Sequence, residues 1–161
     1  MAEYPRVIGQ DADQGDARGD ERDGQPGLRD GVRQKALVDA SNVAHFSEGP
    51  APRFKNIVLV VRKLMEEGYE PIVVADAALR HQIDERDEYE KRIEEGKVHQ
   101  APSGTDADYF ILSFARELDS SIVSNDRFRD RAEAFPDAYD RIIRYMIVAD
   151  EVVFERRNKP R

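Results

Sequence analysis

Acidic side chains directly follow two of the apolar runs in this 161-residue sequence. Asp39 ends one run, and Asn42 lies three residues further on. Asp126 follows the second run, and Asp130 comes one helical turn later. Ligands of open α/β sheets bind at the carboxyl ends of the strands, so these residues are candidates for a shared crevice.

Two further acids begin a helical pattern after the loop Pro102-Ser-Gly-Thr105. These are Asp106 and Asp108, and Thr105 is a candidate N-cap for the helix. Asp76 also follows an apolar run, although a loop or capping role explains it as well as a catalytic role does.

Several carboxylates gathered in one crevice would repel one another, and burying them without partners would be costly. A divalent cation relieves this repulsion, and Mg²⁺ or Mn²⁺ prefers oxygen ligands. A carboxylate cluster of this kind suits metal-assisted hydrolysis of phosphodiesters. Any single acid could equally cap a helix or lie in a loop, but the matching positions of Asp39, Asp108 and Asp126 favour a common site.

Alternating apolar runs and helical patterns must position these acids. We expect strands at 36–38, 71–75, 97–101, 120–124, 145–148 and 152–154, and helices at 54–67, 83–95 and 106–118. This alternation predicts a three-layer α/β fold with a mostly parallel central sheet flanked by helices.

The composition excludes several classes of protein. The sequence has no Cys, which rules out thiolate metal sites, disulfide scaffolds and Cys nucleophiles. No apolar run approaches the roughly 20 residues of a membrane span, and the N-terminus lacks a signal-peptide pattern, so we expect a cytoplasmic protein without a membrane partner. The net charge of -8 argues against a broad basic surface that coats nucleic acid.

The first 34 residues differ from the rest of the chain. They are rich in Gly, Asp, Gln and Arg, and their eight acids and five Arg give a net charge of -3, which leaves -5 for the remainder. Such a segment buries too little apolar surface to fold. We therefore predict a disordered acidic tail at 1–34, a catalytic-type domain at 35–156 and a flexible C-terminus at 157–161.

Four motifs, in order along the chain, resemble the NYN branch of the PIN-like ribonucleases, and most closely the Regnase-type catalytic domain. They are Val38-Asp-Ala-Ser-Asn-Val-Ala44, Gly104-Thr-Asp-Ala-Asp-Tyr-Phe-Ile111, Ile122-Val-Ser-Asn-Asp-Arg-Phe-Arg-Asp130 and the closing segment 144–154. In animals this domain is joined to a CCCH zinc finger, which has no counterpart here. The resemblance implies a PIN-like (NYN) fold and a Mg²⁺- or Mn²⁺-dependent endoribonuclease that leaves a 5′-phosphate and a 3′-hydroxyl.

The resemblance also implies roles for individual residues. Asp39 would be the primary metal ligand, Asp108 and Asp126 would complete the metal shell, and Asp130 would support it. Asn42 would hold the geometry of the site or contact the scissile phosphate. The resemblance also places Asp106 with the metal ligands. Animal relatives have two adjacent acids here, whereas Ala107 separates Asp106 from Asp108 in this sequence. Residues i and i+2 of a helix do not share a face, so the two acids would point in different directions.

RNA, expected to be single-stranded, requires positive charge beside the acids. Residues near the strand ends could supply contacts to it, and the predicted substrate-binding set is Asn42, Arg53, Arg80, Ser124, Asn125 and Arg127. Tyr109 and Phe128 could stack on bases, although Phe128 could equally belong to the core. The resemblance leaves a homodimer open.

Three other functions are compatible with the sequence. One is a catalytically weak nuclease-fold module that binds RNA or protein, and the intact acid set disfavours it. A second is a toxin-type PIN ribonuclease. A third is a phosphatase or phosphotransferase on a doubly wound sheet, although the sequence has no GxxxxGK[ST] phosphate loop.

Overall fold

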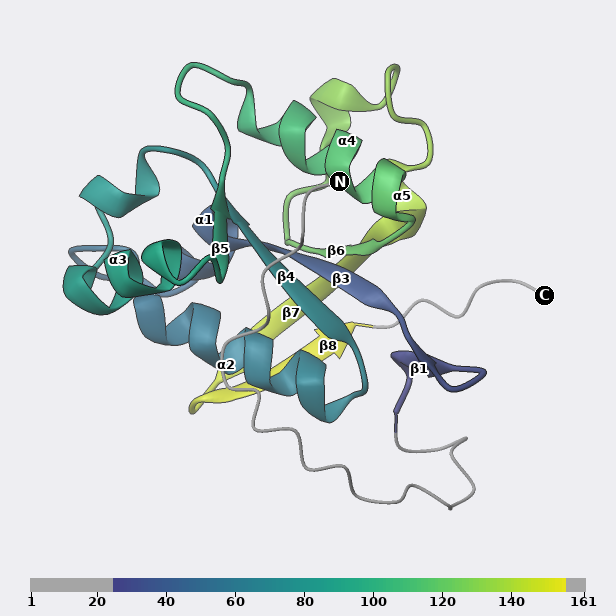
Figure 1. The fold of residues 1–161 in the computed structure, drawn as a ribbon, viewed down its shortest axis with the longest axis horizontal. Coiled ribbons are helices and arrows are strands. Elements are labelled where there is room, and N and C mark those ends of the chain that lie inside the picture. Colours follow the sequence, from purple (N-terminus) through teal and green to yellow (C-terminus); the bar gives the residue numbers. More distant parts are fainter. Residues whose placement is uncertain (1–24, 156–161) are drawn as a thin grey trace.

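The structure is a computed structural model that describes residues 25–155. A six-stranded sheet forms its centre, with the strand order β5-β4-β3-β6-β7-β8 (Figure 1). The first five strands of this order run parallel, and β8 pairs antiparallel with β7 at one edge. The strands of this sheet are β3 (Lys35–Asp39), β4 (Glu70–Ala75), β5 (Val98–Gln100), β6 (Ser121–Val123), β7 (Ile142–Val148) and β8 (Glu151–Glu155).

Helices connect the parallel strands and cover both faces of the sheet. They are α1 (Ala40–Ala44), α2 (Phe54–Glu66), α3 (Arg86–Glu94), α4 (Ala107–Leu118) and α5 (Ala138–Arg141), with two 3₁₀ turns, η1 (Leu79–His81) and η2 (Arg129–Arg131). None of the helices within residues 25–155 is both long and apolar enough to cross a bilayer.

Alternate residues of the central strands feed two separate cores, because successive side chains of a strand point to opposite faces. Val38 of β3 packs in one core with Ile57 of α2, whereas Leu37 packs in the other with Ile111 of α4. The helices α2 and α4 accordingly lie on opposite sides of the sheet (Figure 1). The predicted three-layer arrangement with a mostly parallel sheet is therefore confirmed.

Two elements begin three residues away from their expected starts. The helix expected at 83–95 begins at Arg86, because the Asp84 side chain bonds to the start of α2 instead. Ile83 is buried, the Asp84 carboxylate accepts a hydrogen bond from Phe54 N at 2.7 Å, and Glu85 takes a left-handed φ of 46°. At the other end of the domain, β7 starts at Ile142, three residues before the expected strand.

The predicted N-cap of α4 is wrong. Asp106, not Thr105, caps this helix, and its Oδ1 accepts hydrogen bonds from the backbone N–H groups of Asp108 and Tyr109. Ser, Thr, Asn and Asp all favour this position, so the sequence pattern alone left a one-residue ambiguity.

Residues 25–34, which we had assigned to the predicted tail, form a small hairpin against the domain. Its strands are β1 (Leu28–Arg29) and β2 (Val32–Arg33). Gly27 is buried beside Tyr69, where a Cβ would lie 2.4 Å from the Tyr69 backbone nitrogen, so only glycine fits there. The rest of the predicted tail and the predicted C-terminal segment 157–161 lie outside the described residues.

Candidate active site at the carboxyl edge of the sheet

Asp39 lies at the centre of the carboxyl edge, where β3 ends and α1 begins. Its side chain is only 7% exposed and caps α1 by accepting a hydrogen bond from Asn42 N at 3.4 Å. Its other oxygen accepts a hydrogen bond from Ser124 Oγ at 2.9 Å. Asp39 is therefore a buried carboxylate held in place from two neighbouring parts of the sheet edge.

The electrostatics of Asp39 show that other acids lie close to it. Burial raises the pKa of Asp39 to about 6, against the opposing effect of its two hydrogen bonds, and the negative charges of Asp108 and Asp126 raise it further. Burial also raises the pKa of Asp108, and the charges of Asp126 and Asp130 add to this. The structure thus brings together the four predicted acids Asp39, Asp108, Asp126 and Asp130.

Asn42 is fixed by a hydrogen-bond network behind the acids. Its Oδ1 accepts hydrogen bonds from Tyr145 OH at 2.7 Å and from Asn125 N at 3.0 Å. The side chain of Asn125 in turn bonds both the N–H and the C=O of Tyr145. Asn125 therefore ties β7 to the site, and its side chain is engaged in this link rather than directed to a substrate.

Tyr145 contacts the site through Asn42, whereas the sequence predicts only that it lies in a strand. It is 5% exposed, and its hydroxyl also donates toward Asn42 O at 3.1 Å. The available signal was a hydroxyl within a buried apolar strand, because a buried Tyr O–H requires a hydrogen-bond partner.

The Ser124 hydroxyl links the Asp39 side chain to the Asp126 backbone. Ser124 is fully buried, and its Oγ accepts a hydrogen bond from Asp126 N at 3.1 Å while donating to Asp39. Asp126 itself is exposed and accepts from Phe128 N at 2.8 Å. Ser124 was predicted to bind substrate, but its burial gives it the role of positioning the two acids.

Asp106 is not joined to the four acids in the same way. It caps α4 and forms an ion pair with Arg131. Both interactions engage its carboxylate away from Asp39, whose own partners are Ser124 and Asn42. The structure gives Asp106 a capping role, and the predicted metal role receives no support from its position.

The three predicted phosphate-binding arginines differ in availability. Arg80 makes a two-point contact with Glu90, with nitrogen–oxygen distances of 2.9 and 2.6 Å, so its charge is largely compensated. Arg53 is exposed immediately before α2, and Arg127 is exposed next to Asp126. Of these three arginines, Arg127 is the one that is adjacent in sequence to one of the four acids.

The donor set fits a hard divalent cation, since it consists of carboxylate oxygens whose charges repel one another. Within residues 25–155, no three acidic or His side chains are close enough to enclose a metal by themselves. Mg²⁺ commonly binds through one or two carboxylates and keeps several waters, so it needs no closed protein cage. Asp39, with Asp108 and Asp126 beside it, is the set that could hold such an ion.

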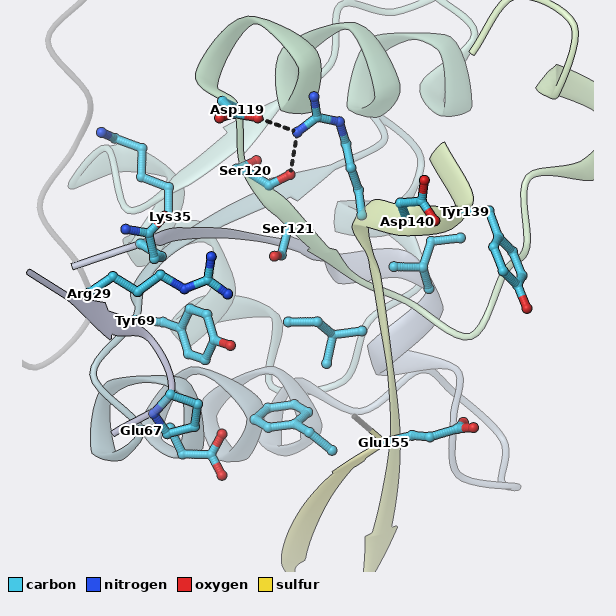
Figure 2. A pocket seen from close by; sticks show the side chains of 16 residues that line it. Arg29, Lys35, Glu67, Tyr69, Asp119, Ser120, Ser121, Tyr139, Asp140 and Glu155 are labelled. Atoms are coloured by element: carbon cyan, nitrogen blue, oxygen red, sulfur yellow. Dashed lines mark hydrogen bonds and ion pairs between the residues drawn. The ribbon is translucent and has the colours of Figure 1, made fainter. Parts of the chain in front are cut away.

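A cavity of about 470 Å³ lies at the opposite edge of the sheet, where β3, β6 and β7 begin (Figure 2). Figure 2 shows Arg29, Lys35 and Ser121 around it, with the Arg141 guanidinium bonded to Asp119 and to the Ser120 carbonyl. None of the four acids lines this cavity, so it is separate from the carboxylate site.

Comparison with known families identifies the domain. The family described as the Zc3h12a-like ribonuclease NYN domain matches residues 32–161, most of the chain. The chain belongs to this family. The carboxylate edge is therefore the edge of an NYN ribonuclease domain, and the predicted NYN resemblance is confirmed. No curated protein matches the chain.

Two solved structures of the nuclear proteinaceous RNase P 2 (PRORP2) of Arabidopsis thaliana share the fold of this NYN domain. One has a TM-score of 0.63 at 22% identity over 75% of the present chain, and the other a TM-score of 0.62 at 21% identity over 78%. The matched part is 29% and 30% of the respective PRORP2 chains, so the present chain spans less than a third of that protein.

Proposed function

We propose that this NYN domain is a divalent-metal-dependent endoribonuclease that hydrolyses single-stranded RNA. Water adds to the phosphorus and the bond to O3′ breaks, which leaves a 5′-phosphate on one fragment and a 3′-hydroxyl on the other. The observation that supports this most strongly is the buried Asp39 carboxylate with Asp108 and Asp126 close enough to raise its pKa. Membership of a ribonuclease family supplies the substrate class.

Mg²⁺ or Mn²⁺ bound at these acids would supply an activated water and neutralise charge on the phosphoryl group. The protein contributes a fixed set of oxygens. The Ser124 hydroxyl fixes the Asp39 carboxylate and the backbone N–H of Asp126 relative to each other. Its Oγ lies 2.9 Å from the Asp39 carboxylate and 3.1 Å from the Asp126 nitrogen. Asp130 adds negative charge beside Asp108 and thereby favours a cation there.

Asn42 positions the site from the opposite side. Its Oδ1 accepts hydrogen bonds from Tyr145 OH and Asn125 N, which leaves its Nδ2 group, the donor of the side chain, for a substrate. An amide N–H at this edge suits a non-bridging phosphate oxygen. Arg127 provides positive charge on the Asp126 side.

The experiment uses a 5′-labelled single-stranded RNA and purified protein in Mg²⁺, in Mn²⁺ and in EDTA. We expect cleavage only with metal, and labelled fragments that end in a 3′-hydroxyl. Asp126→Asn should abolish cleavage, whereas Asp87→Asn, a change of an exposed acid on α3, should not. Cleavage that persists in EDTA, or fragments that end in a 2′,3′-cyclic phosphate, would refute the metal-activated water. Binding without cleavage would instead support the non-cutting RNA-binding alternative.

A further inference from the structure

A second cavity, of about 300 Å³, lies on the crossover from β6 to β7, and none of the four acids lines it directly. Its lining comes from the segment around η2 and from α5 and the residues before it: Arg127, Phe128, Arg129, Ala132, Phe135, Pro136, Ala138 and Tyr139. This volume lies at the lower end of the range for small-ligand sites. The cavity begins one residue after Asp126.

The charges of this crossover are unevenly compensated. Arg131 pairs with Asp106, Arg116 pairs with Asp137, and Arg141 pairs with Asp119 and Asp137. Arg127 and Arg129, both exposed, make no ion pair with any described residue. Among the described arginines between β6 and β7, the two without an ion pair to a described acid are therefore the two that line the cavity.

The rest of the lining is apolar and aromatic. Phe128 is 2% exposed and Phe135 5% exposed, so both form a packed floor, while Tyr139 is 57% exposed at the surface. Because the Arg116 guanidinium already lies over the Phe135 ring at 4.5 Å, the exposed ring of Tyr139 is the aromatic surface of this lining that a base could contact. Proteins bind unpaired nucleotides in this way, with the base on an aromatic surface and the phosphates on Arg.

Phe128 lies between Arg127 and Arg129 in the sequence, and all three residues line the cavity. Phe128 has a φ of 50°, the left-handed region that a bulky residue rarely adopts. Its N–H is held by Asp126 Oδ1, and its ring is anchored in the core with Ile111 and Leu112. The same short segment thus presents Asp126 and Asp130 to the acid site and Arg127 and Arg129 to the cavity.

We propose that this cavity is a nucleotide subsite of the RNA strand: it takes the base of a nucleotide adjacent to the scissile phosphate, and Arg127 and Arg129 bind the flanking phosphates. The inference rests on the proposed ribonuclease function and deepens it. It assigns to the domain a base-contacting position at a fixed distance from the cleaved bond.

The first test replaces each nucleotide of a 12-residue RNA in turn by an abasic nucleotide and measures its cleavage. One position next to the cleaved bond should lower kcat/KM by about five- to 100-fold, the range for loss of one stacked base. Ala132→Leu fills the cavity and should remove this penalty while slowing cleavage of the intact RNA. Ala134→Leu, in the same crossover but outside the lining, is the matched control and should retain the wild-type profile. A flat abasic profile would overturn the subsite.

The second test is binding of a labelled six-nucleotide RNA in EDTA, which does not depend on cleavage. Ala132→Leu, and Arg127→Gln combined with Arg129→Gln, should weaken binding at least about fivefold relative to Ala134→Leu. Equal affinities would overturn the subsite even if the domain cleaves RNA. A protein that cleaves nothing but shows the loss of affinity would refute the proposed function and keep the subsite.

Discussion

Asp39 is a carboxylate whose position makes its charge unfavourable in the absence of a cation. It is buried, it lies beside Asp108 and Asp126, and only the two hydrogen bonds from Ser124 and Asn42 offset this. This arrangement supports the proposal that Asp39 binds a cation, in addition to capping α1. The unfavourable charge can be measured as a dependence of stability on pH.

The fold raises the pKa of Asp39 from its usual 3.8 to about 6, so the folded protein binds this proton more tightly than the unfolded chain. Between pH 4 and pH 6 the unfolded chain has released the proton and the folded protein still holds it. The contribution of Asp39 to the free energy of unfolding must therefore fall as the pH rises through this window, by on the order of 2–3 kcal/mol.

Asn cannot titrate, so Asp39→Asn isolates this effect. In EDTA, its free energy of unfolding relative to wild type should rise by that amount between pH 4 and pH 6 and then level off. Urea unfolding of both proteins across pH 4–8 measures it. If the difference in the free energy of unfolding between the two proteins stays constant with pH, the fold does not raise the pKa of Asp39.

Tyr145 supports the site by donating its hydroxyl to Asn42. Tyr145→Phe leaves the ring in the core and removes one donor from a buried acceptor, which should lower the free energy of unfolding by about 1–2 kcal/mol. If Asn42 contacts the scissile phosphate, kcat should also fall. Unfolding and cleavage rates indistinguishable from wild type would remove Tyr145 from the site.

At the scale of elements, the sequence predicted the sheet edge well. The parallel strands and the acids at their carboxyl ends followed from hydrophobic patterning and from the rule that loops after parallel strands share one edge. The hydrogen bonds among Asn42, Asn125 and Tyr145 join residues 20 to 103 positions apart, and a local pattern holds no information on such contacts. For the same reason, the pairing of Arg80 with Glu90 across a turn and a helix was not foreseen.

The start of α4 shows how a structural acid can resemble a catalytic one. Asp106 caps this helix, so Asp106→Ala should cost about 1 kcal/mol of stability, while Asp106→Asn retains a capping oxygen and should cost little. Cleavage by Asp106→Asn should stay within about twofold of wild type. Thermal unfolding and a cleavage assay test both points, and a large loss of activity without a loss of stability would return Asp106 to the metal ligands.

At the scale of the whole molecule, the net charge of -8 argues against a broad basic field, so under the proposed function a few local cations would hold the RNA. If Arg127 and Arg129 are the main phosphate contacts, the slope of log affinity against log salt should be roughly -1.4 for a single strand. Fluorescence anisotropy with a short RNA between 50 and 500 mM salt measures this slope. A slope steeper than about -4 would require a basic surface that the described residues do not supply.

The most direct test of the catalytic site is the single-turnover rate of RNA cleavage by Asp39→Asn in Mg²⁺. Asparagine has almost the same shape but no charge, so it should weaken metal binding without emptying the buried position. We expect the rate to fall at least about 100-fold, because both metal binding and charge stabilisation depend on this group. Asp87→Asn should stay within about twofold of wild type. An Asp39→Asn protein that cleaves RNA within a few-fold of the wild-type rate would contradict the assignment of this edge as the active site.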